Sequence, residues 1–558
     1  MLQNQLQIAK AGPEREPQRG QEVEQLGLYR DVERTRGLVE EQLSARAPFL
    51  EEEGHATVIV STISRCIMPR SREASANRPG AGERIVAMDR WLGSALGYIP
   101  RWIEFQMRMS QQPGCIVAVA HRDAIVLERA FGTADLATGE ALTPRHRFRV
   151  ASHSKSFTAA GILKLREQGK LKLDDPAGQF VDGLNSAVAR VTITQLLSHS
   201  AGLIRDGRDA GQYLDRRPFF SARELRADLK VPPTIAPNTR FKYSNHGYGL
   251  LGLIIEAIAG EPYRAWIKRE IVDAVGLKET TPDMPLPRGV PFARGHTGRV
   301  LLGRRLTIRG DFETHAVCPA GGFVSTAADL ARYFAQLSPK ARKSVLSVAS
   351  RREMVRRQWR NPHSSIEQFY GLGTVSGSLN GWDWFGHSGG LQGYISRTCV
   401  VPKQDLTISV LTNAIDGWAG MWVDGLIHIL RAYARNGAPT RKVKDWGGRW
   451  WTLWGAVDLL PMGNKVVVVG PGFSNPLIDA SEVEITGRNA GRIALASGYS
   501  SHGEPVRCAR AKSGKIVEIW LGASKLLPAT KVAREIEARY AKRAIRRPRH
   551  IGSKRPAP

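Results

Sequence analysis

The chain has 558 residues, of which 42% are hydrophobic, and its formal net charge is +28. This length predicts a globular protein with two or more domains. Its five cysteines are far apart and form no Cys-x-x-Cys pair, so neither a disulfide framework nor a zinc site is indicated. No stretch approaches the roughly 18 apolar residues of a membrane span, and residues 1–20 lack the apolar core of a signal peptide. As written, the chain is therefore predicted to be cytoplasmic.

The positive charge is spread along the chain and is densest from Lys542 to Arg555, where seven Lys and Arg occur without an acidic residue. Such charge attracts nucleic acid, anionic lipid or acidic substrates. No nucleic-acid-binding motif accompanies it, so we expect no specific nucleic-acid partner. We expect residues 531–558 to be a solvated basic tail.

Residues 1–87 are rich in Glu, Gln and Arg, and their composition predicts a largely disordered extension. An alternative is that translation begins at Met88. A first domain is predicted at 88–437. It opens with apolar runs at 115–120 and 124–128, which His121-Arg122-Asp123 joins as a hairpin.

The rest of this domain alternates helical patterns with turns. A second hairpin is predicted at 394–401 and 406–412, with its turn at 402–405. Thr326-x-x-Asp329 is a capping pattern for a helix that runs to residue 334. The other predicted helices span 157–168, closed by Gly169, and 193–203, 250–258 and 417–434.

After residue 437 the pattern of the sequence changes from mixed helices and strands to short strands. Short apolar runs at 466–469, 482–485, 492–495 and 515–520, separated by turn residues, predict a small antiparallel β domain at 438–530 with the form of a barrel or half-barrel. Four tryptophans gather at its start: Trp446, Trp450, Trp451 and Trp454. Stacking on sugars is one interpretation, and packing in the core is the favoured one.

The stretch with the clearest chemistry is Ser152-x-x-Lys155. On a helix, residues i and i+3 share a face, so the lysine amine would lie beside the serine hydroxyl. A lysine whose pKa is lowered by burial can take the serine proton and so activate a nucleophile. Ser152 could instead be a simple helix N-cap. Lys155 is the only lysine in the chain with a serine three residues before it.

Two further motifs follow in order, Tyr243-x-Asn245 and His387-x-Gly389. With Ser152-x-x-Lys155 they resemble the active-site motifs of the serine β-lactamase and penicillin-binding-protein superfamily. The resemblance is closest to its class C-like branch: class C β-lactamases, DD-peptidases, D-aminopeptidases and esterase-like serine hydrolases. It runs from about residue 95 to 435, and it includes the non-catalytic segments 171–176, 196–202 and 321–326.

This resemblance implies an α/β (α+β) fold, in which a five-stranded-type antiparallel sheet is flanked by helices and faces a helical lobe. It also implies roles for the motif residues. Ser152 would be the nucleophile, Lys155 its base, and Tyr243 a proton relay. Asn245 would bind a substrate amide or hold Lys155. His387 and Gly389 would bind substrate, and the amides of Ser152 and Gly390 would form the oxyanion hole.

His387 departs from the family pattern, because many members have lysine there. A neutral imidazole is a weak anchor for a carboxylate, so we expect neutral esters and amides to be better substrates than carboxylate-bearing β-lactams. His199 has no partner at metal-ligand spacing, and we interpret it as structural. The chemistry needs no metal or organic cofactor.

The resulting prediction is a serine hydrolase that forms an acyl-enzyme on Ser152 and acts on a small ester, amide or peptide. One alternative is a catalytically silent protein of the same fold that binds peptidoglycan-type peptides. Another, based on charge alone, is a nucleic-acid-associated protein. The sequence defines neither the substrate, which depends on loops such as 206–220, nor the oligomeric state.

Overall fold

The computed structural model describes residues 89–541, except residues 363, 365 and 498–500. The extension predicted at 1–87 and the stretch from Lys542 to Arg555 lie outside the described residues.

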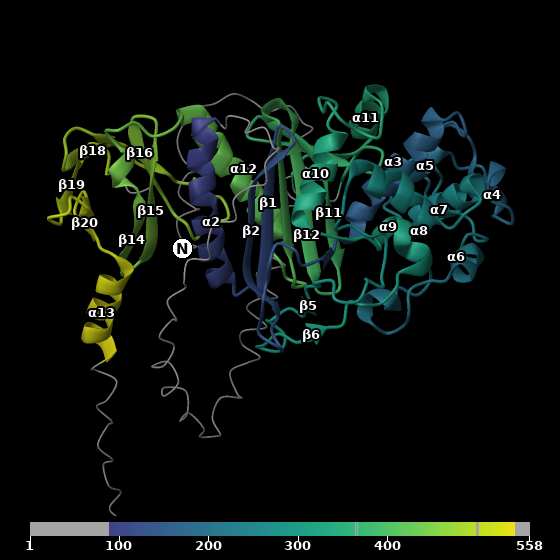
Figure 1. Cartoon of the computed structure of the whole chain (residues 1–558), viewed down its shortest axis with the longest axis horizontal. Coiled ribbons are helices and arrows are strands. Elements are labelled where there is room, and N and C mark those ends of the chain that lie inside the picture. Colours follow the sequence, from purple (N-terminus) through teal and green to yellow (C-terminus); the bar gives the residue numbers. More distant parts are fainter. Residues whose placement is uncertain (1–88, 363, 365, 498–500, 542–558) are drawn as a thin grey trace, which may run out of the picture. The chain divides into compact units, whose positions relative to one another are not determined.

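The centre of the fold is a nine-stranded antiparallel sheet (Figure 1). The resemblance implied five strands; here β2, β1, β13, β12 and β11 form the long central part, and shorter strands extend both edges. In sheet order the strands are β3 (Glu140–Ala141), β2 (Ala124–Asp135), β1 (Gly114–His121), β13 (Leu406–Thr412), β12 (Tyr394–Val401), β11 (Trp382–Leu391), β10 (Val375–Leu379), β9 (Gln368–Tyr370) and β8 (Trp359–Arg360).

Both faces of the sheet are covered. Along β1, Ile116 and Ala118 belong to one core cluster, while Val117 and Val119 belong to another, as the two-residue period of a strand requires. Helices α2 (Arg90–Ser110) and α12 (Ala419–Asn436) pack together on the second face. Helix α10 (Ala327–Leu337) packs on the first face, and Thr326 caps it as predicted.

A helical lobe lies beyond α10 on the first face (Figure 1). Its helices include α3 (Ser154–Glu167), α4 (Ser186–Ala189), α5 (Ile193–Leu197), α6 (Ala222–Asp228), α7 (Asn245–Ala259), α8 (Tyr263–Ile267), α9 (Cys318–Gly321) and α11 (Val348–Val355). Two predicted helices have different bounds. The helix predicted at 193–203 ends at Leu197, because His199 takes a left-handed conformation with φ 61°. The helix predicted at 250–258 begins at Asn245, where the Ser244 side chain caps it.

The C-terminal strands form a second, eight-stranded meander in which each strand pairs with the next. They are β14 (Gly448–Thr452), β15 (Gly455–Met462), β16 (Lys465–Val469), β17 (Ser481–Ile485), β18 (Ala490–Leu495), β19 (Pro505–Arg510), β20 (Ile516–Leu521) and β21 (Ser524–Leu526). Two backbone hydrogen bonds between Trp451 and Leu527 bring its ends together, so the sheet is a nearly closed barrel. This confirms the predicted small β domain.

Part of the predicted basic tail is ordered: Ala529–Tyr540 form helix α13, which packs on β14. The tryptophans at the start of this domain differ in their burial. Trp446 and Trp450 are buried in the barrel core, as favoured, but Trp454 is 97% exposed at the β14–β15 turn. The Tyr98 hydroxyl on α2 donates a hydrogen bond to Asp458 of β15, so this domain packs on the sheet domain.

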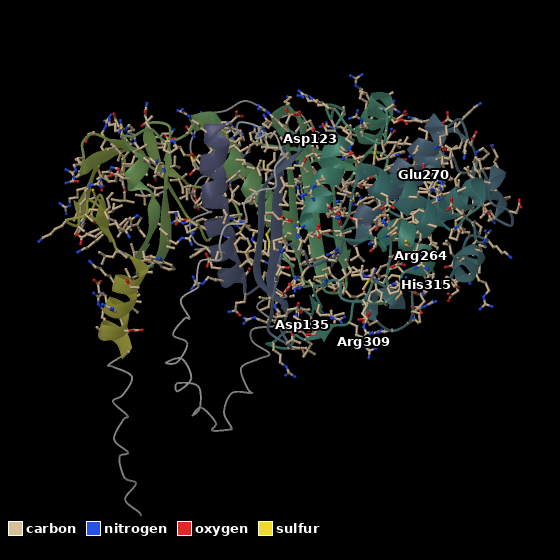
Figure 2. All side chains as sticks on the ribbon, in the orientation of Figure 1. Asp123, Asp135, Arg264, Glu270, Arg309 and His315 are labelled. Atoms are coloured by element: carbon tan, nitrogen blue, oxygen red, sulfur yellow. The ribbon has the colours of Figure 1, made fainter. Side chains whose placement is uncertain are left out.

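Acidic and basic side chains are interspersed, and many form ion pairs, such as Glu270 with Lys164 and Arg264 with Glu313 (Figure 2). Within residues 89–541, apart from the gaps, no helix is both long and apolar enough to cross a membrane.

Candidate active site

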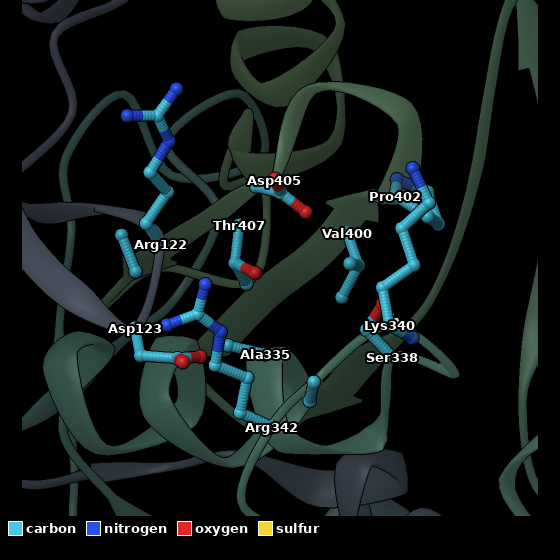
Figure 3. A pocket seen from close by; sticks show the side chains of 12 residues that line it. Arg122, Asp123, Ala335, Ser338, Lys340, Arg342, Val400, Pro402, Asp405 and Thr407 are labelled. Carbon is cyan, nitrogen blue, oxygen red and sulfur yellow. Dashed lines mark hydrogen bonds between the residues drawn. The ribbon is translucent and has the colours of Figure 1, made fainter. Parts of the chain in front are cut away.

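A cavity of about 880 Å³ lies between the helical lobe and strand β11. Five of the predicted site residues line it: Ser152, Tyr243, Asn245, His387 and Gly390. We name its two sides by their elements. The lobe wall comprises Ser152, Lys155, Tyr243 and Asn245, and the strand wall is residues 387–391 of β11. A second cavity, of about 400 Å³, lies at the β1–β2 and β12–β13 turns and is lined by charged side chains such as Arg122, Lys340 and Asp405 (Figure 3). It contains none of the motif residues.

Ser152 lies in a 3-10 turn, Ala151–His153, directly before α3. Its side chain caps no helix, which argues against the simple N-cap interpretation. Ala151 has φ 47°, in the left-handed region that costs an alanine about 1 kcal/mol. Just upstream, the fully buried Arg149 is hydrogen-bonded to Asp283 at 3.1 Å and to the carbonyl of Gly322 at 2.9 Å. These contacts hold the strained turn in place.

Lys155 is completely buried beneath this turn. Its Nζ donates to Asn245 Oδ1 and to the carbonyl of Ala320, both at 2.7 Å, and lies 3.2 Å from Ser152 Oγ. The predicted i, i+3 pair is therefore in contact. Burial lowers the pKa of Lys155 well below its usual range, and nearby Arg205 lowers it further while Asp206 opposes the shift. A lysine in this setting can act as a base.

The Tyr243 hydroxyl donates a hydrogen bond to Ser152 Oγ at 2.8 Å. Burial raises the pKa of Tyr243 above its usual range, although its bond to Ser152 and Arg205 counter part of the shift. The phenol therefore stays protonated where Lys155 can be neutral. The two side chains that contact Ser152 Oγ thus differ in kind, with one able to take a proton and the other able to donate one.

Asn245 is held on both sides by the protein. Its Oδ1 accepts from Lys155, while its Nδ2 donates to Asp206 Oδ1 at 2.5 Å and to the Tyr213 hydroxyl at 3.0 Å. Of the two predicted roles, this geometry fits the one that holds Lys155. Asp206 and Tyr213 were not singled out in the sequence; both belong to the loop that was expected to shape the pocket.

His199 packs against the ring of Tyr243. Its ring centroid is 4.1 Å from that of Tyr243, and its Nδ1 accepts a hydrogen bond from the backbone N–H of Ser244 at 3.1 Å. This fits the structural interpretation. Among the described residues, no group of three or more His, Cys, Asp and Glu could hold a metal ion.

The strand wall presents mainly the backbone of β11 to the cavity. Strand β10 pairs only with Trp382–Gly386, so it leaves the edge of β11 from His387 onward uncovered on that side. Gly389 is buried, and a Cβ there would lie 2.1 Å from the carbonyl oxygen of Val150. Gly390 lines the cavity, and its nearest neighbour for a Cβ is 3.5 Å away. Glycine at 389 is thus what allows β11 to approach the turn before Ser152.

His387 is only 4% exposed, and both ring nitrogens have partners. Nδ1 is 2.6 Å from the carbonyl of Ser388 and Nε2 is 3.0 Å from the Tyr370 hydroxyl. Burial lowers the pKa of His387 to about 3, with His153 and Lys155 adding to the shift. The imidazole is therefore neutral, as expected, and Nδ1 donates to Ser388 while Nε2 accepts from Tyr370. A second His-x-Gly, at His296, lies outside this cavity, with His296 Nδ1 bonded to the carbonyl of Asn413.

Comparison with known proteins assigns this arrangement to a family. The Beta-lactamase family matches residues 99–418, more than half of the chain, and the chain belongs to that family. This confirms the predicted superfamily and fold class.

Individual relatives are distant. The chain is 29% identical over 316 residues to penicillin-binding protein 4 of Amycolatopsis lactamdurans, covering 54% of this chain and 81% of that protein. It is 25% identical over 324 residues to protein flp of Staphylococcus aureus (strain MW2), covering 56% of this chain but only 61% of that protein.

Solved structures share the fold at lower identity. An octameric penicillin-binding protein homologue from Pyrococcus abyssi has a TM-score of 0.54 at 22% identity, covering 78% of this chain and all of that one. The D-amino acid amidase of Ochrobactrum anthropi SV3, complexed with L-phenylalanine amide, has a TM-score of 0.53 at 21% identity, covering 62% of this chain and 99% of that one.

Proposed function

We propose that the protein is a serine hydrolase that forms an acyl-enzyme on Ser152 and hydrolyses a small ester, amide or peptide. The observation that carries the proposal is the environment of one atom. Ser152 Oγ faces the cavity and is contacted by Lys155 Nζ at 3.2 Å and by the Tyr243 hydroxyl at 2.8 Å. Membership of the Beta-lactamase family supports the same chemistry.

In the first step, neutral Lys155 accepts the Ser152 proton as Oγ attacks the substrate carbonyl carbon. The two short bonds at Nζ, to Asn245 and to the carbonyl of Ala320, use the two protons of the neutral amine. The lone pair is then left for the Ser152 hydroxyl. Asn245, fixed by Asp206 and Tyr213, keeps the amine in this orientation.

The carbonyl oxygen becomes negative in the tetrahedral intermediate. The amides of Ser152 and Gly390 are proposed to stabilise it, each contributing on the order of 3 kcal/mol. Tyr243 is protonated and next to Oγ, so it passes its proton to the leaving group as the intermediate collapses, and the proton that Lys155 took from Ser152 replaces it on the phenol oxygen. Water then attacks the acyl-enzyme, and the same groups act in reverse.

His387 is proposed to support the strand wall through Tyr370 and to meet substrate only as a neutral group. A carboxylate directed toward it finds no positive charge. We retain the prediction that β-lactams, whose carboxylate lies there in the family pattern, are poorer substrates than neutral esters and amides.

The proposal is tested by turnover of a panel of 4-nitrophenyl esters, D-amino-acid amides and nitrocefin. The amides are included because one structural relative is a D-amino acid amidase. We expect at least one ester or amide to be hydrolysed, with loss of activity in Ser152→Ala but not in Ser378→Ala, an exposed serine of β10 that does not line the cavity. A protein that binds peptides silently would turn over none of them.

A further inference from the structure

Charged side chains also line the cavity, outside the motif residues. Three charged side chains line the cavity: Arg205, Asp206 and Arg397. Arg397 is 11% exposed and its guanidinium is paired with Asp424 through both terminal nitrogens, at 3.0 Å each. Both oxygens of Asp206 are engaged, by Asn245 and by Arg205. Arg205, with 65% of its side chain exposed, is the charged group most accessible to a ligand.

The position of Arg205 is fixed by its backbone and by one edge of its guanidinium. Its carbonyl accepts hydrogen bonds from the N–H groups of Asn245 and His246 at the start of α7, at 2.9 and 3.2 Å. Its Nε is 3.0 Å from Asp206 Oδ2. No hydrogen bond or ion pair within the described residues involves its two terminal nitrogens. They form the planar fork that matches a carboxylate.

This fork lies close to the reacting atoms. The guanidinium carbon is 5.6 Å from the centre of the Tyr243 ring, and the hydroxyl of that ring contacts Ser152 Oγ. A substrate acylating Ser152 therefore passes within reach of Arg205 if it carries an acid a few bonds from its carbonyl. Strand-wall residue His387 is neutral and Arg397 is paired with Asp424, so the accessible positive charge of this cavity is on the opposite wall from the one where the family pattern places lysine.

We propose that Arg205 determines specificity by binding a carboxylate of the substrate, so that the enzyme prefers monoesters or amides of short dicarboxylic acids. This inference rests on the proposed serine hydrolase function. Asp206 orients the guanidinium through Nε, and the two terminal nitrogens donate to the two carboxylate oxygens. The carboxylate stays intact, and the chemistry occurs at the other end of the molecule, at Ser152.

The test compares two esters of equal length, mono-4-nitrophenyl adipate, which carries a carboxylate, and its methyl ester, which is neutral. In Arg205→Gln we expect the ratio of kcat/KM for the acid to that for the methyl ester to fall about tenfold or more, mainly through KM. Arg205→Lys keeps the charge but loses the fork, so its ratio should be intermediate. Arg208→Gln is the control, because Arg208 is an exposed arginine of the same loop that does not line the cavity. Its ratio should be that of the wild type.

An unchanged ratio in Arg205→Gln would overturn the proposal. If that unchanged ratio came with an equal loss on both esters, Arg205 would act only by lowering the pKa of Lys155 and Tyr243. Binding of the two esters to Ser152→Ala by calorimetry separates this question from catalysis. If the acid ester binds more tightly than the methyl ester but the wild type hydrolyses neither, only the hydrolase function is contradicted. If the wild type hydrolyses both esters without preferring the acid, only the role of Arg205 is contradicted.

Discussion

The two walls of the cavity are built in opposite ways. The lobe wall is a buried network of side chains, in which Lys155, Asn245 and Asp206 are linked by successive hydrogen bonds. The strand wall presents the backbone of residues 387–391, whose single large polar side chain, His387, is turned toward Tyr370 and Ser388. Proton transfer needs side chains with shifted pKa values in fixed positions, whereas stabilising an oxyanion needs only amides that can come close.

This difference predicts how mutations should act. Changes on the lobe wall should reduce the chemical step while the protein stays folded. Changes on the strand wall should act first on packing and stability. The four predictions that follow are ordered by the size of the expected effect.

Lys155→Met removes the proposed base but keeps an unbranched side chain in a completely buried site. We expect kcat to fall by about 10³-fold or more, with a small change in KM. In the wild type, kcat/KM should rise with pH as Lys155 loses its proton, with a midpoint below the usual lysine pKa of about 10.4. Steady-state kinetics across pH measures both. A variant with near-normal kcat would remove Lys155 from the mechanism.

Tyr243→Phe keeps the ring that packs on His199 and removes only the hydroxyl that contacts Ser152. We expect kcat to fall by about 10²-fold, less than for Lys155→Met, because the base remains. The loss should be greater for amides than for 4-nitrophenyl esters, whose leaving group needs no proton. Equal losses on the two substrates would argue against a role in protonating the leaving group.

Gly389→Ala places a Cβ 2.1 Å from the carbonyl oxygen of Val150, where the backbone must move. We expect a loss of about 1–3 kcal/mol in the free energy of unfolding, by denaturant titration, together with reduced activity. Gly390→Ala is the matched control, because its Cβ meets only Ile395 Cδ1, at 3.5 Å. If Gly390→Ala were the less stable of the two, the close approach of β11 to the Ser152 turn would not be as described.

His387 predicts a pH dependence of stability. Its folded pKa is about 3 and its unfolded pKa is near the ordinary 6.5, so the unfolded chain binds the extra proton between these values. Stability should therefore be fully present above about pH 6.5 and decline as the pH falls toward 3, by up to about 1.4 kcal/mol per pH unit for this group. His387→Gln should make the decline less steep. A slope equal to that of the wild type would show that His387 is not buried in the neutral form.

The residues that come together in the candidate site were easier to predict from the sequence than the geometry that holds them. Ser152-x-x-Lys155 was recognisable because the spacing of a helical turn alone brings the two side chains together. The left-handed Ala151 was not predictable, because an alanine takes that conformation only under packing from elements distant in the sequence. Asp206 was missed for a similar reason: its partner Asn245 is 39 residues away and no local motif marks it.

The same distinction holds for the fold. The two hairpins around β1 and β13 were predicted because each has uninterrupted apolar runs and a polar turn. Strands β14, β15, β19 and β21 were missed, because glycine, proline or charged residues interrupt their apolar runs. Only pairing with their neighbours in the barrel identifies them as strands.

We propose that Ser152 is a nucleophile activated by the lobe wall. Incubation with a fluorophosphonate, followed by intact mass and peptide mapping, tests this directly. We expect one adduct per chain, on the peptide that contains Ser152, and no adduct in Ser152→Ala, whose fold is checked by circular dichroism. An unlabelled wild-type protein, or an adduct that maps to another serine and persists in Ser152→Ala, would contradict it.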